Sequence, residues 1–351
     1  MDDAARTRSL RLRAQGLSGP HAAGVEAVLE RLVGVQAQEL GFARLAFRPR
    51  RGRTAVAADV DAALRDRALV WTWAMRGTLH LVRAADAGWL IGLLGPIFAA
   101  RGRPRRLALG LDDALCERAA AQLREILVAE GPLTRAALAA RLPIDARGQA
   151  PAHLVAYAAQ RGVICRAPPA AGREPTYVLL EDWLGAAPVP LSHDAALARL
   201  AQRYICGHGP AAAADLAAWS GIGLRRARRA LALAAPELHE DEPGRFAAPS
   251  RARTDPRPDA RPEVALLGHF DPYLLGYASR DLVLDRRHAK RIQAGGGFIA
   301  PAVLVDGRVA GTWRVGARDW LEPFEPLAED VLAALERERA NVERYTSGAA
   351  S

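Results

Sequence analysis

The sequence predicts an α+β protein, mainly α-helical, that is divided into several domains. The chain has 351 residues, and 50% of them are hydrophobic, which is enough for two to four domains with their own cores. Helical periodicity and short strands alternate up to about residue 250, and a β-rich pattern follows. Gly131-Pro132 and Gly209-Pro210 begin turns at equivalent places in two similar stretches, which indicates a tandem duplication.

The first predicted domain covers residues 1–111. A helical pattern over Val25–Val33 leads into a short polar stretch, and a second helix is expected over Val60–Leu69 with Asp59 as its N-cap. Val70–Val82 alternates large apolar residues with small or polar ones, which predicts one or two strands. The order helix, helix, β-ribbon is typical of a winged helix.

Two further copies of this order are expected, at residues 112–190 and 191–250. Helix-turn-helix units with a β-wing are DNA-binding modules by default, although they also serve as spacers and dimer contacts. In the second copy, Thr134 is expected to cap the second helix. The predicted elements are helices at 115–129, 135–141 and 149–161 with strands at 162–166 and 177–180, then helices at 195–204, 212–219 and 224–233 with strands at 238–240 and 245–247.

The fourth predicted domain is β-rich and covers residues 251–351. It begins with a linker rich in Pro, Arg and Asp, Ser250–Pro262, and Asp306-Gly307 marks a tight hairpin. A surface helix rich in Arg and Glu ends the domain. The predicted strands are 264–267, 281–284, 302–305 and 308–314, and the predicted helix is 328–345.

Charge is distributed unevenly along the chain. The net charge is +9; residues 1–111 hold 18 arginines against 9 acidic residues, whereas residues 112–351 hold 30 basic and 30 acidic residues. The whole positive excess therefore lies in the first predicted domain, where it would attract a polyanion. A coding bias toward arginine explains why Lys290 is the only lysine, but it does not explain the scarcity of acidic residues in this domain.

Several kinds of site are disfavoured. The three cysteines lie far apart without a Cys-x-x-Cys pair, which fits a reducing compartment and argues against a zinc site. No apolar run has the length of a membrane span, and the N-terminus has no apolar core of signal-peptide length. Gly295-Gly296-Gly297 lacks the ending of a P-loop and predicts a flexible hairpin, and no Gly-x-Ser-x-Gly elbow is present. We therefore expect a cytoplasmic, nucleoid-associated protein with no metal and no membrane partner.

Gln36 and Gln38 flank one small residue where the first helical pattern ends. Two residues apart on a helix point about 200° away from each other, so the two amides can converge only if the helix ends near Val35. Glutamine is neutral and cannot be a general base, but its amide oxygen can orient a water molecule and stabilise positive charge. The alternative is that both side chains cap the helix end or bind backbone.

A second polar group lies in the predicted β-ribbon. Arg76, Thr78 and His80 alternate with other residues, so on a strand they would share one face that carries a cation, a hydroxyl and an imidazole. Gly77 would let another backbone come close. A polar strand that faces solvent is the alternative.

Basic residues cluster in two places. The denser cluster directly follows the glutamines, and the second surrounds Lys290; both are expected to contact DNA phosphates. For each residue of the first cluster, a solvated loop is the alternative. The residues so assigned are Arg44, Arg48, Arg50, Arg51 and Arg53, then Arg286, Arg287, Lys290 and Arg291.

Taken together, these motifs resemble those of the AlkZ-like winged-helix DNA glycosylases, which include enzymes for alkylated bases and interstrand crosslinks. Members of that family carry a Gln-x-Gln or Gln-x-Asp motif after the first long helix. The resemblance extends over nearly the full length in the same order. Its residues are Gln36-Ala37-Gln38, Trp73–His80, Phe270–Tyr277 with Arg280, Val305–Gly307 and Gly311–Arg314. Gly268-His269 departs from the family, where Pro-Ala often precedes Phe-Asp.

The resemblance implies a monofunctional DNA glycosylase that acts without a metal or an organic cofactor. Gln36 and Gln38 would be catalytic; Arg76, Thr78 and His80 would line the site, and Arg280 would join the DNA-binding residues. The expected partner is double-stranded DNA with alkylated or crosslinked purines, and the expected state is a monomer. Lyase chemistry is not expected, because a Schiff base needs a lysine or a terminal amine and the chain has one lysine.

A second class of function stays open at this point. The chain could be a non-enzymatic winged-helix protein that regulates transcription or shields damaged DNA. Such a protein would have no need of Gln36 and Gln38 and would read sequence through a recognition helix such as Leu224–Leu233.

Overall fold

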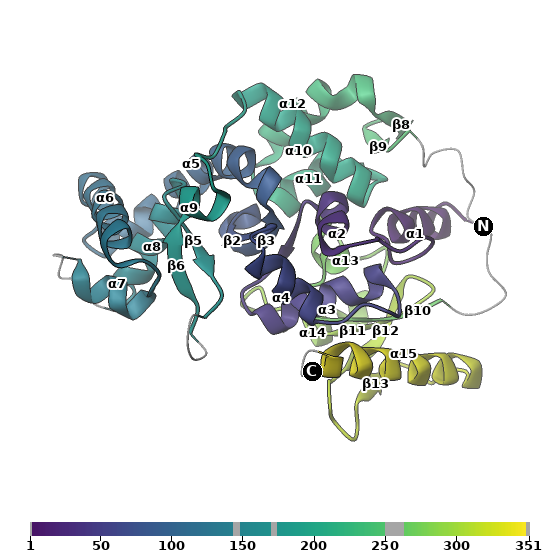
Figure 1. Ribbon diagram of the computed structural model, residues 1–351. Helices are drawn as coiled ribbons and strands as arrows, with labels where there is room; N and C mark the ends of the chain where they lie inside the picture. Colours follow the sequence, from purple (N-terminus) through teal and green to yellow (C-terminus); the bar gives the residue numbers. More distant parts are fainter. Residues whose placement is uncertain (1, 143–147, 170–173, 250–262, 349–351) are drawn as a thin grey trace. The chain divides into compact units, whose positions relative to one another are not determined.

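The structure, a computed structural model, describes residues 2–142, 148–169, 174–249 and 263–348. It divides into two compact units (Figure 1). Unit 1 comprises Met1–Ala62 and Ala198–Ser351, and unit 2 comprises Ala63–Leu197. This division differs from the four predicted domains, because the first of them contributes to both units. The predicted linker Ser250–Pro262 lies outside the described residues.

Unit 2 contains an antiparallel sheet in which described strands follow the order β3-β2-β5-β6-β4. The pairing of β2 with β3 is regular from Leu69↔Arg83 to Trp73↔Leu79. The ribbon predicted over 70–82 is thereby confirmed as two strands. The strand bounds are β2 Leu69–Trp73, β3 Leu79–Arg83, β4 Leu133–Thr134, β5 Ile164–Ala167 and β6 Thr176–Leu179.

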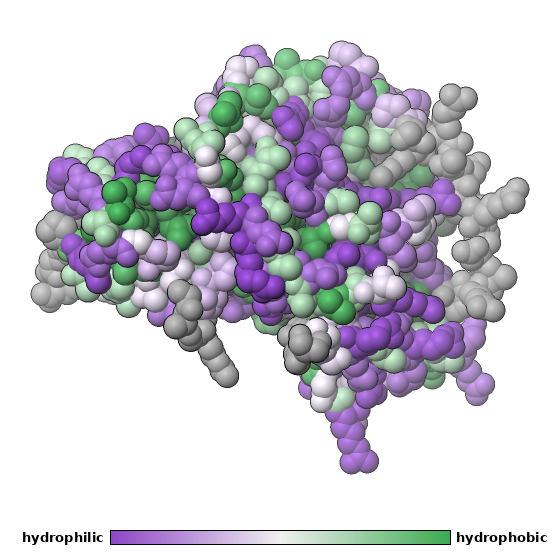
Figure 2. All heavy atoms as spheres, viewed as in Figure 1, coloured by the Kyte–Doolittle hydropathy of each residue, from purple (hydrophilic) through white to green (hydrophobic). Residues whose placement is uncertain are grey.

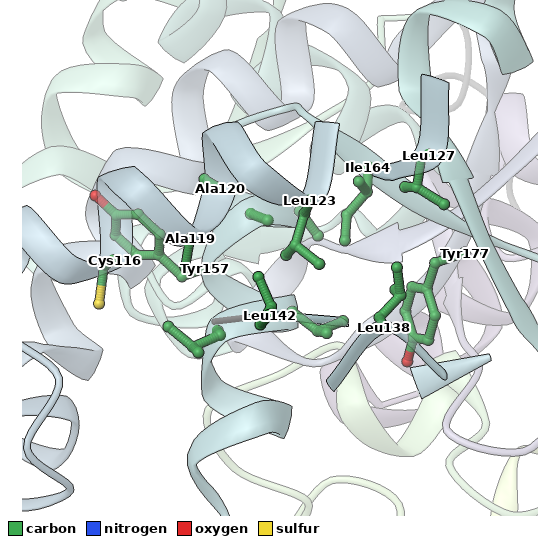
Figure 3. Packing of buried hydrophobic residues seen from close by; sticks show 14 of the residues in the cluster. Cys116, Ala119, Ala120, Leu123, Leu127, Leu138, Leu142, Tyr157, Ile164 and Tyr177 are labelled. Carbon is green, nitrogen blue, oxygen red and sulfur yellow. The ribbon is translucent and has the colours of Figure 1, made fainter. Parts of the chain in front are cut away.

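Helices of unit 2 enclose a hydrophobic core beside this sheet. Cys116, Leu123, Leu138 and Ile164 have no exposed surface and come from two helices and a strand (Figure 3). Thr134 accepts from Ala137 N at 3.2 Å, so the predicted N-cap is confirmed. The helices are α5 Ala84–Ala108, α6 Asp113–Glu130, α7 Arg135–Arg141, α8 Ala150–Gln160 and α9 Leu180–Leu184.

Helix α5 is long and apolar, and it packs closely against α8. A Cβ on Gly95 of α5 would lie 1.9 Å from the carbonyl oxygen of Gln160, so only glycine permits this approach. Among the described helices, α5 with its 25 residues included, none has the combination of length and hydrophobicity that crossing a membrane requires.

Unit 1 contains a second segment with the same order of elements as 113–179. In both segments a long helix, a two-residue strand, two helices and two strands follow one another, and the short strand pairs with the last strand. The repeat predicted from the Gly-Pro turns is thus present in the secondary structure. Its elements here are α10 His193–His208, β7 Ala211–Ala212, α11 Ala213–Ser220, α12 Leu224–Ala234, β8 His239–Glu242 and β9 Arg245–Ala247.

The C-terminal part of unit 1 is an antiparallel sheet in the order β10-β11-β12-β13, with α15 packed against it. Asp306-Gly307 makes the predicted hairpin between β11 and β12. The strand predicted at 281–284 is wrong, because these residues form turns. The elements are β10 Val264–Leu267, α13 Pro272–Leu275, α14 Ala289–Ile292, β11 Ala302–Val305, β12 Arg308–Trp313, β13 Leu321–Pro323 and α15 Glu329–Ser347.

The N-terminal part of unit 1 is helical. The helix predicted at 25–33 is confirmed, and α3 covers a stretch for which the sequence analysis predicted no helix. Asp59 lies inside α4 rather than at its N-cap, and it accepts from Val56 N at 3.2 Å. The elements are α1 Asp3–Ala14, α2 Val25–Leu32, β1 Gly34–Gln36, α3 Leu40–Arg51 and α4 Ala58–Arg65.

Candidate functional site

The Gln36-Ala37-Gln38 segment joins two helices of unit 1, and its first residue ends the short strand β1. Helix α2 ends at Leu32, and Val33 takes a left-handed φ of 68° that breaks the helix. The chain then runs extended through Gln36, and Glu39 with φ −124° is the N-cap of α3. The expectation that the helix ends before the glutamines is therefore confirmed, and the two amides are not forced to opposite sides of one helix.

The two glutamines differ in exposure. Gln36 is 8% exposed and Ala37 is fully buried, whereas Gln38 is exposed. The buried Ala37 anchors the segment between them. An amide that is largely excluded from water next to an exposed one suits a surface where one side chain is fixed and the other can meet a ligand.

Helix α3, which follows the glutamines, is held in place at its C-terminal end by contacts of the Arg50 side chain. The Arg50 side chain is 1% exposed. Its Nε donates to Gln15 O at 3.0 Å, and Nη1 donates to Ala46 O at 2.7 Å. Nη1 and Nη2 each donate to a carboxylate oxygen of Asp271 at 2.8 Å, and Nη2 also donates to Gln15 Oε1 at 3.1 Å. All five N–H groups of the guanidinium are therefore used internally.

This network corrects the expectation that Arg50 contacts DNA. No donor and almost no surface is left for a phosphate. The Phe270–Tyr277 segment, one of those that resemble the family, supplies Asp271 as the partner of Arg50. Tyr277 belongs to the same buried network, because Gln15 Nε2 donates to its hydroxyl at 3.3 Å.

The other arginines of α3 are also engaged within unit 1. Arg48 is 5% exposed and pairs with Glu338, and burial lowers the pKa of Arg48 to about 10. Arg48 is thus an internal residue, as Arg50 is. Arg44 and Arg51 pair with Asp61 and Asp59 at 2.7 Å, at partly exposed positions where an anion could compete. Arg53 is exposed.

Arg76, Thr78 and His80 do not share one face of a strand, so that expectation is wrong. Met75–Gly77 forms a single turn of 3₁₀-helix between β2 and β3, and Arg76 has a left-handed φ of 57°. Gly77 is also left-handed, and a Cβ there would lie 3.2 Å from the ring of Phe98. A tight turn at the end of the ribbon replaces the alternation that a continuous strand would give.

The turn nevertheless gathers the three residues around a buried imidazole. His80 is 2% exposed, and its Nδ1 lies 2.9 Å from Thr78 O and 3.5 Å from Thr78 Oγ1. Since a carbonyl oxygen only accepts, Nδ1 carries the proton and Nε2 is left as an acceptor. Burial, with a smaller contribution from the positive charge of Arg76, lowers the pKa of His80 to about 3. His80 is therefore neutral at physiological pH.

The C-terminal basic residues are more accessible than those of α3. Arg286 and Arg287 are mostly exposed, although carboxylates accompany both. Lys290 is exposed, and Arg291 lies over the ring of Phe324 at 4.6 Å. Arg280 is different, because it is half-buried and its Nε donates to Leu274 O at 2.7 Å.

A cavity of about 420 Å³ lies in unit 2, and neither the two glutamines nor the residues of the His80 turn are among its lining residues. Apolar residues such as Leu127 and Val178 form most of its wall, and Arg65 and Arg67 also line it. Hydrophobic side chains also appear at the surface near α6 in Figure 2. In the part of the chain that the structure describes, no group of three or more His, Cys, Asp or Glu side chains is placed to hold a metal ion.

Comparisons with known proteins agree along nearly the whole chain. The family model described as DNA glycosylase AlkZ-like matches residues 29–345. The chain is 31% identical to the interstrand DNA cross-link repair glycosylase of Streptomyces sahachiroi, over 90% of this chain and 89% of that protein. The solved structure of the Streptomyces sahachiroi DNA glycosylase AlkZ superposes with a TM-score of 0.84 at 27% identity, over 97% of this chain and 96% of that one.

Proposed function

The chain belongs to the DNA glycosylase AlkZ-like family, and on that premise we propose that it hydrolyses the N-glycosidic bond of bulky alkylated purines in duplex DNA. The expected lesions are of the N7-alkylguanine type and include purines joined by an interstrand crosslink. The observation that carries the proposal is the non-helical Gln36-Ala37-Gln38 segment, which has one largely buried and one exposed amide between two helices.

Amides suffice for this chemistry. An N7-alkylguanine already has a positive charge, so its departure needs no proton. When the C1′–N9 bond breaks, the bonding electrons neutralise the base and leave a sugar cation. Gln36 and Gln38 are proposed to stabilise that cation with their amide oxygens and to orient the water that attacks C1′; this water then loses a proton to solvent.

Arg76, Thr78 and His80 are proposed to contact the substrate. His80 is neutral, since its pKa is lowered to about 3, and it therefore cannot supply a proton at neutral pH. Its role would be that of a fixed hydrogen-bond acceptor through Nε2. Arg76 would supply positive charge for a phosphate or for the O6 and N7 region of a neighbouring guanine.

The product is proposed to be an intact abasic site. The only lysine, Lys290, lies on α14 among basic residues that suit phosphate contacts. We expect no covalent complex with DNA after borohydride reduction. Such an activity would serve base excision repair, or it would protect a cell from a DNA-alkylating compound that the cell itself makes. Three tandem winged helices would form the DNA-binding part of the protein.

The test is release of the modified base from duplexes that carry small, bulky or crosslinked N7-alkylguanine. Abasic sites should form with the wild-type protein and should decrease at least about 100-fold with Gln36→Ala/Gln38→Ala, as expected for loss of transition-state stabilisation. Gln202→Ala is the matched control, because Gln202 lies on α10 and pairs with Glu237. Absence of release by the wild-type protein from all three substrates would overturn the proposal.

A further inference from the structure

We propose that α12 of unit 1 is a binding surface for the phosphate backbone of duplex DNA, and that α8, its counterpart in unit 2, is not. The inference rests on the proposed function for the identity of the polyanion. It goes further by distinguishing two segments that have the same order of elements.

The charge of α12 has one sign. Its sequence, LRRARRALALA, contains four arginines and no acidic residue. Ala227, Ala230 and Leu231 are buried on the side toward the unit, and all four arginines are exposed on the other. The partial positive charge at the N-terminus of a helix adds to the attraction for an anion, because the arginines lie in its first half. The four residues are Arg225, Arg226, Arg228 and Arg229.

Two of these arginines are uncompensated. Among the described residues, neither Arg225 nor Arg228 makes a hydrogen bond or an ion pair with another side chain. Exposed arginines elsewhere in the chain commonly have an acidic partner, as Arg141 has Glu130. An arginine that is already paired must give up its carboxylate before it can bind a phosphate. Arg225 and Arg228 can bind phosphates without that loss.

Helix α8 occupies the same place in the order of elements but has the opposite character. Its sequence, APAHLVAYAAQ, contains no Asp, Glu, Lys or Arg. It packs between α6 and α5, where Gln160 O limits residue 95 to glycine. The residues that would read DNA in a helix-turn-helix are therefore used for packing in α8.

The strands that follow α12 do not share its role. Strand β8 has the sequence HEDE and is acidic. Its acids are held within the unit, since Asp241 and Glu242 both pair with Arg245. A negatively charged wing repels phosphates, so the binding surface is confined to the helix and its preceding turn.

The test measures affinity for an undamaged fluorescein-labelled duplex by anisotropy over a series of salt concentrations. Arg225→Ala/Arg228→Ala removes two charges and keeps good helix formers on a solvent-facing side. Loss of two phosphate contacts should lower the slope of log affinity against log salt by about 2 and weaken binding at least tenfold at low salt.

The matched control is Arg337→Ala/Arg339→Ala on α15. It removes the same charge from an exposed helix of the same unit, but on α15 arginines alternate with glutamates. The control should keep the slope of the wild-type protein within about 0.5. Equal slopes for the α12 variant and the wild-type protein, or equal losses in the α12 and α15 variants, would overturn the proposal.

Base release separates this inference from the proposed function. If the wild-type protein releases alkylated bases and the α12 variant binds DNA unchanged, the α12 inference fails and the glycosylase function stands. If no base is released but the α12 variant loses affinity and salt dependence, the surface stands and the glycosylase function fails.

Discussion

The two regions that hold the predicted site residues are stabilised in different ways. The Gln36–Gln38 segment of unit 1 continues into α3, whose far end is fixed by the fully buried Arg50–Asp271 ion pair. In the turn around His80 in unit 2, a neutral buried imidazole donates from Nδ1 to the carbonyl oxygen of Thr78 at 2.9 Å. One region thus depends on a pair of buried charges, and the other contains a buried imidazole that stays neutral.

This difference predicts different sensitivities. A buried ion pair is costly to break, because the remaining charge stays in a medium of low polarity. A buried neutral histidine costs little unfolding free energy at neutral pH. In acid the histidine is protonated in the unfolded chain, and this protonation lowers the stability of the folded protein. The stability of the first region should therefore be sensitive to mutation of the ion pair, and the stability of the second should be sensitive to pH.

The largest effect is expected for Asp271→Asn. The amide keeps the size of the carboxylate but leaves the Arg50 cation buried without its counter-charge, so unit 1 should lose about 3–5 kcal/mol of unfolding free energy. Protection of α3 amides against hydrogen exchange measures this loss. Asp61→Asn, at the partly exposed pair with Arg44, is the control and should cost less than about 1 kcal/mol. Equal losses in both variants would mean that burial of the pair does not matter.

The second effect is a dependence of unit 2 on pH. The pKa of His80 is lowered to about 3 in the folded protein, whereas an unfolded histidine has a pKa of 6.5, so the unfolded chain binds the extra proton first. The stability of unit 2 should therefore fall as pH decreases from 6.5 toward 3, by about 2 kcal/mol between pH 7 and pH 5 from this residue alone.

His80→Gln removes the titrating group and isolates its contribution, because other histidines such as His153 also have a lowered pKa and remain in both proteins. Hydrogen exchange of the β2 and β3 amides at pH 7 and pH 5 gives the difference. Parallel losses in the wild-type protein and the variant would contradict the assignment of the pH dependence to His80.

Local sequence patterns predicted most helices and strands, since periodicity and capping residues act over a few positions. The bounds 135–141 of α7, its cap Thr134 and the Asp306-Gly307 hairpin follow from such signals. The strand expected at 281–284 failed, because its apolar run is short and packs as a turn. The prediction of a continuous strand through Arg76 failed for a related reason. Arginine is not a residue typical of turns, and its left-handed φ is imposed by the surrounding fold.

The candidate site was predictable in part. The interruption of the helical pattern before Gln36 could be predicted from the sequence. Which arginines are buried and which are exposed could not. Density of basic residues identified α3, whose Arg50 and Arg48 are buried by partners more than 200 residues away. Those partners, Asp271 and Glu338, are visible only in the folded chain. Arginines without acidic neighbours on an amphipathic helix are the better signal for an open surface, and α12 satisfies it.

The smallest effect is expected for Thr78→Ala, and it tests what holds the histidine. The hydroxyl of Thr78 donates to Met75 O at 3.1 Å, so its removal should cost about 1 kcal/mol. The bond from His80 Nδ1 goes to the backbone carbonyl of the same residue, which alanine retains. The loss of protection in β2 and β3 between pH 7 and pH 5 should therefore be the same in Thr78→Ala as in the wild-type protein. If the pH dependence disappears in this variant, the hydroxyl and not the backbone keeps His80 neutral, and the contrast between the two regions becomes one of side chains alone.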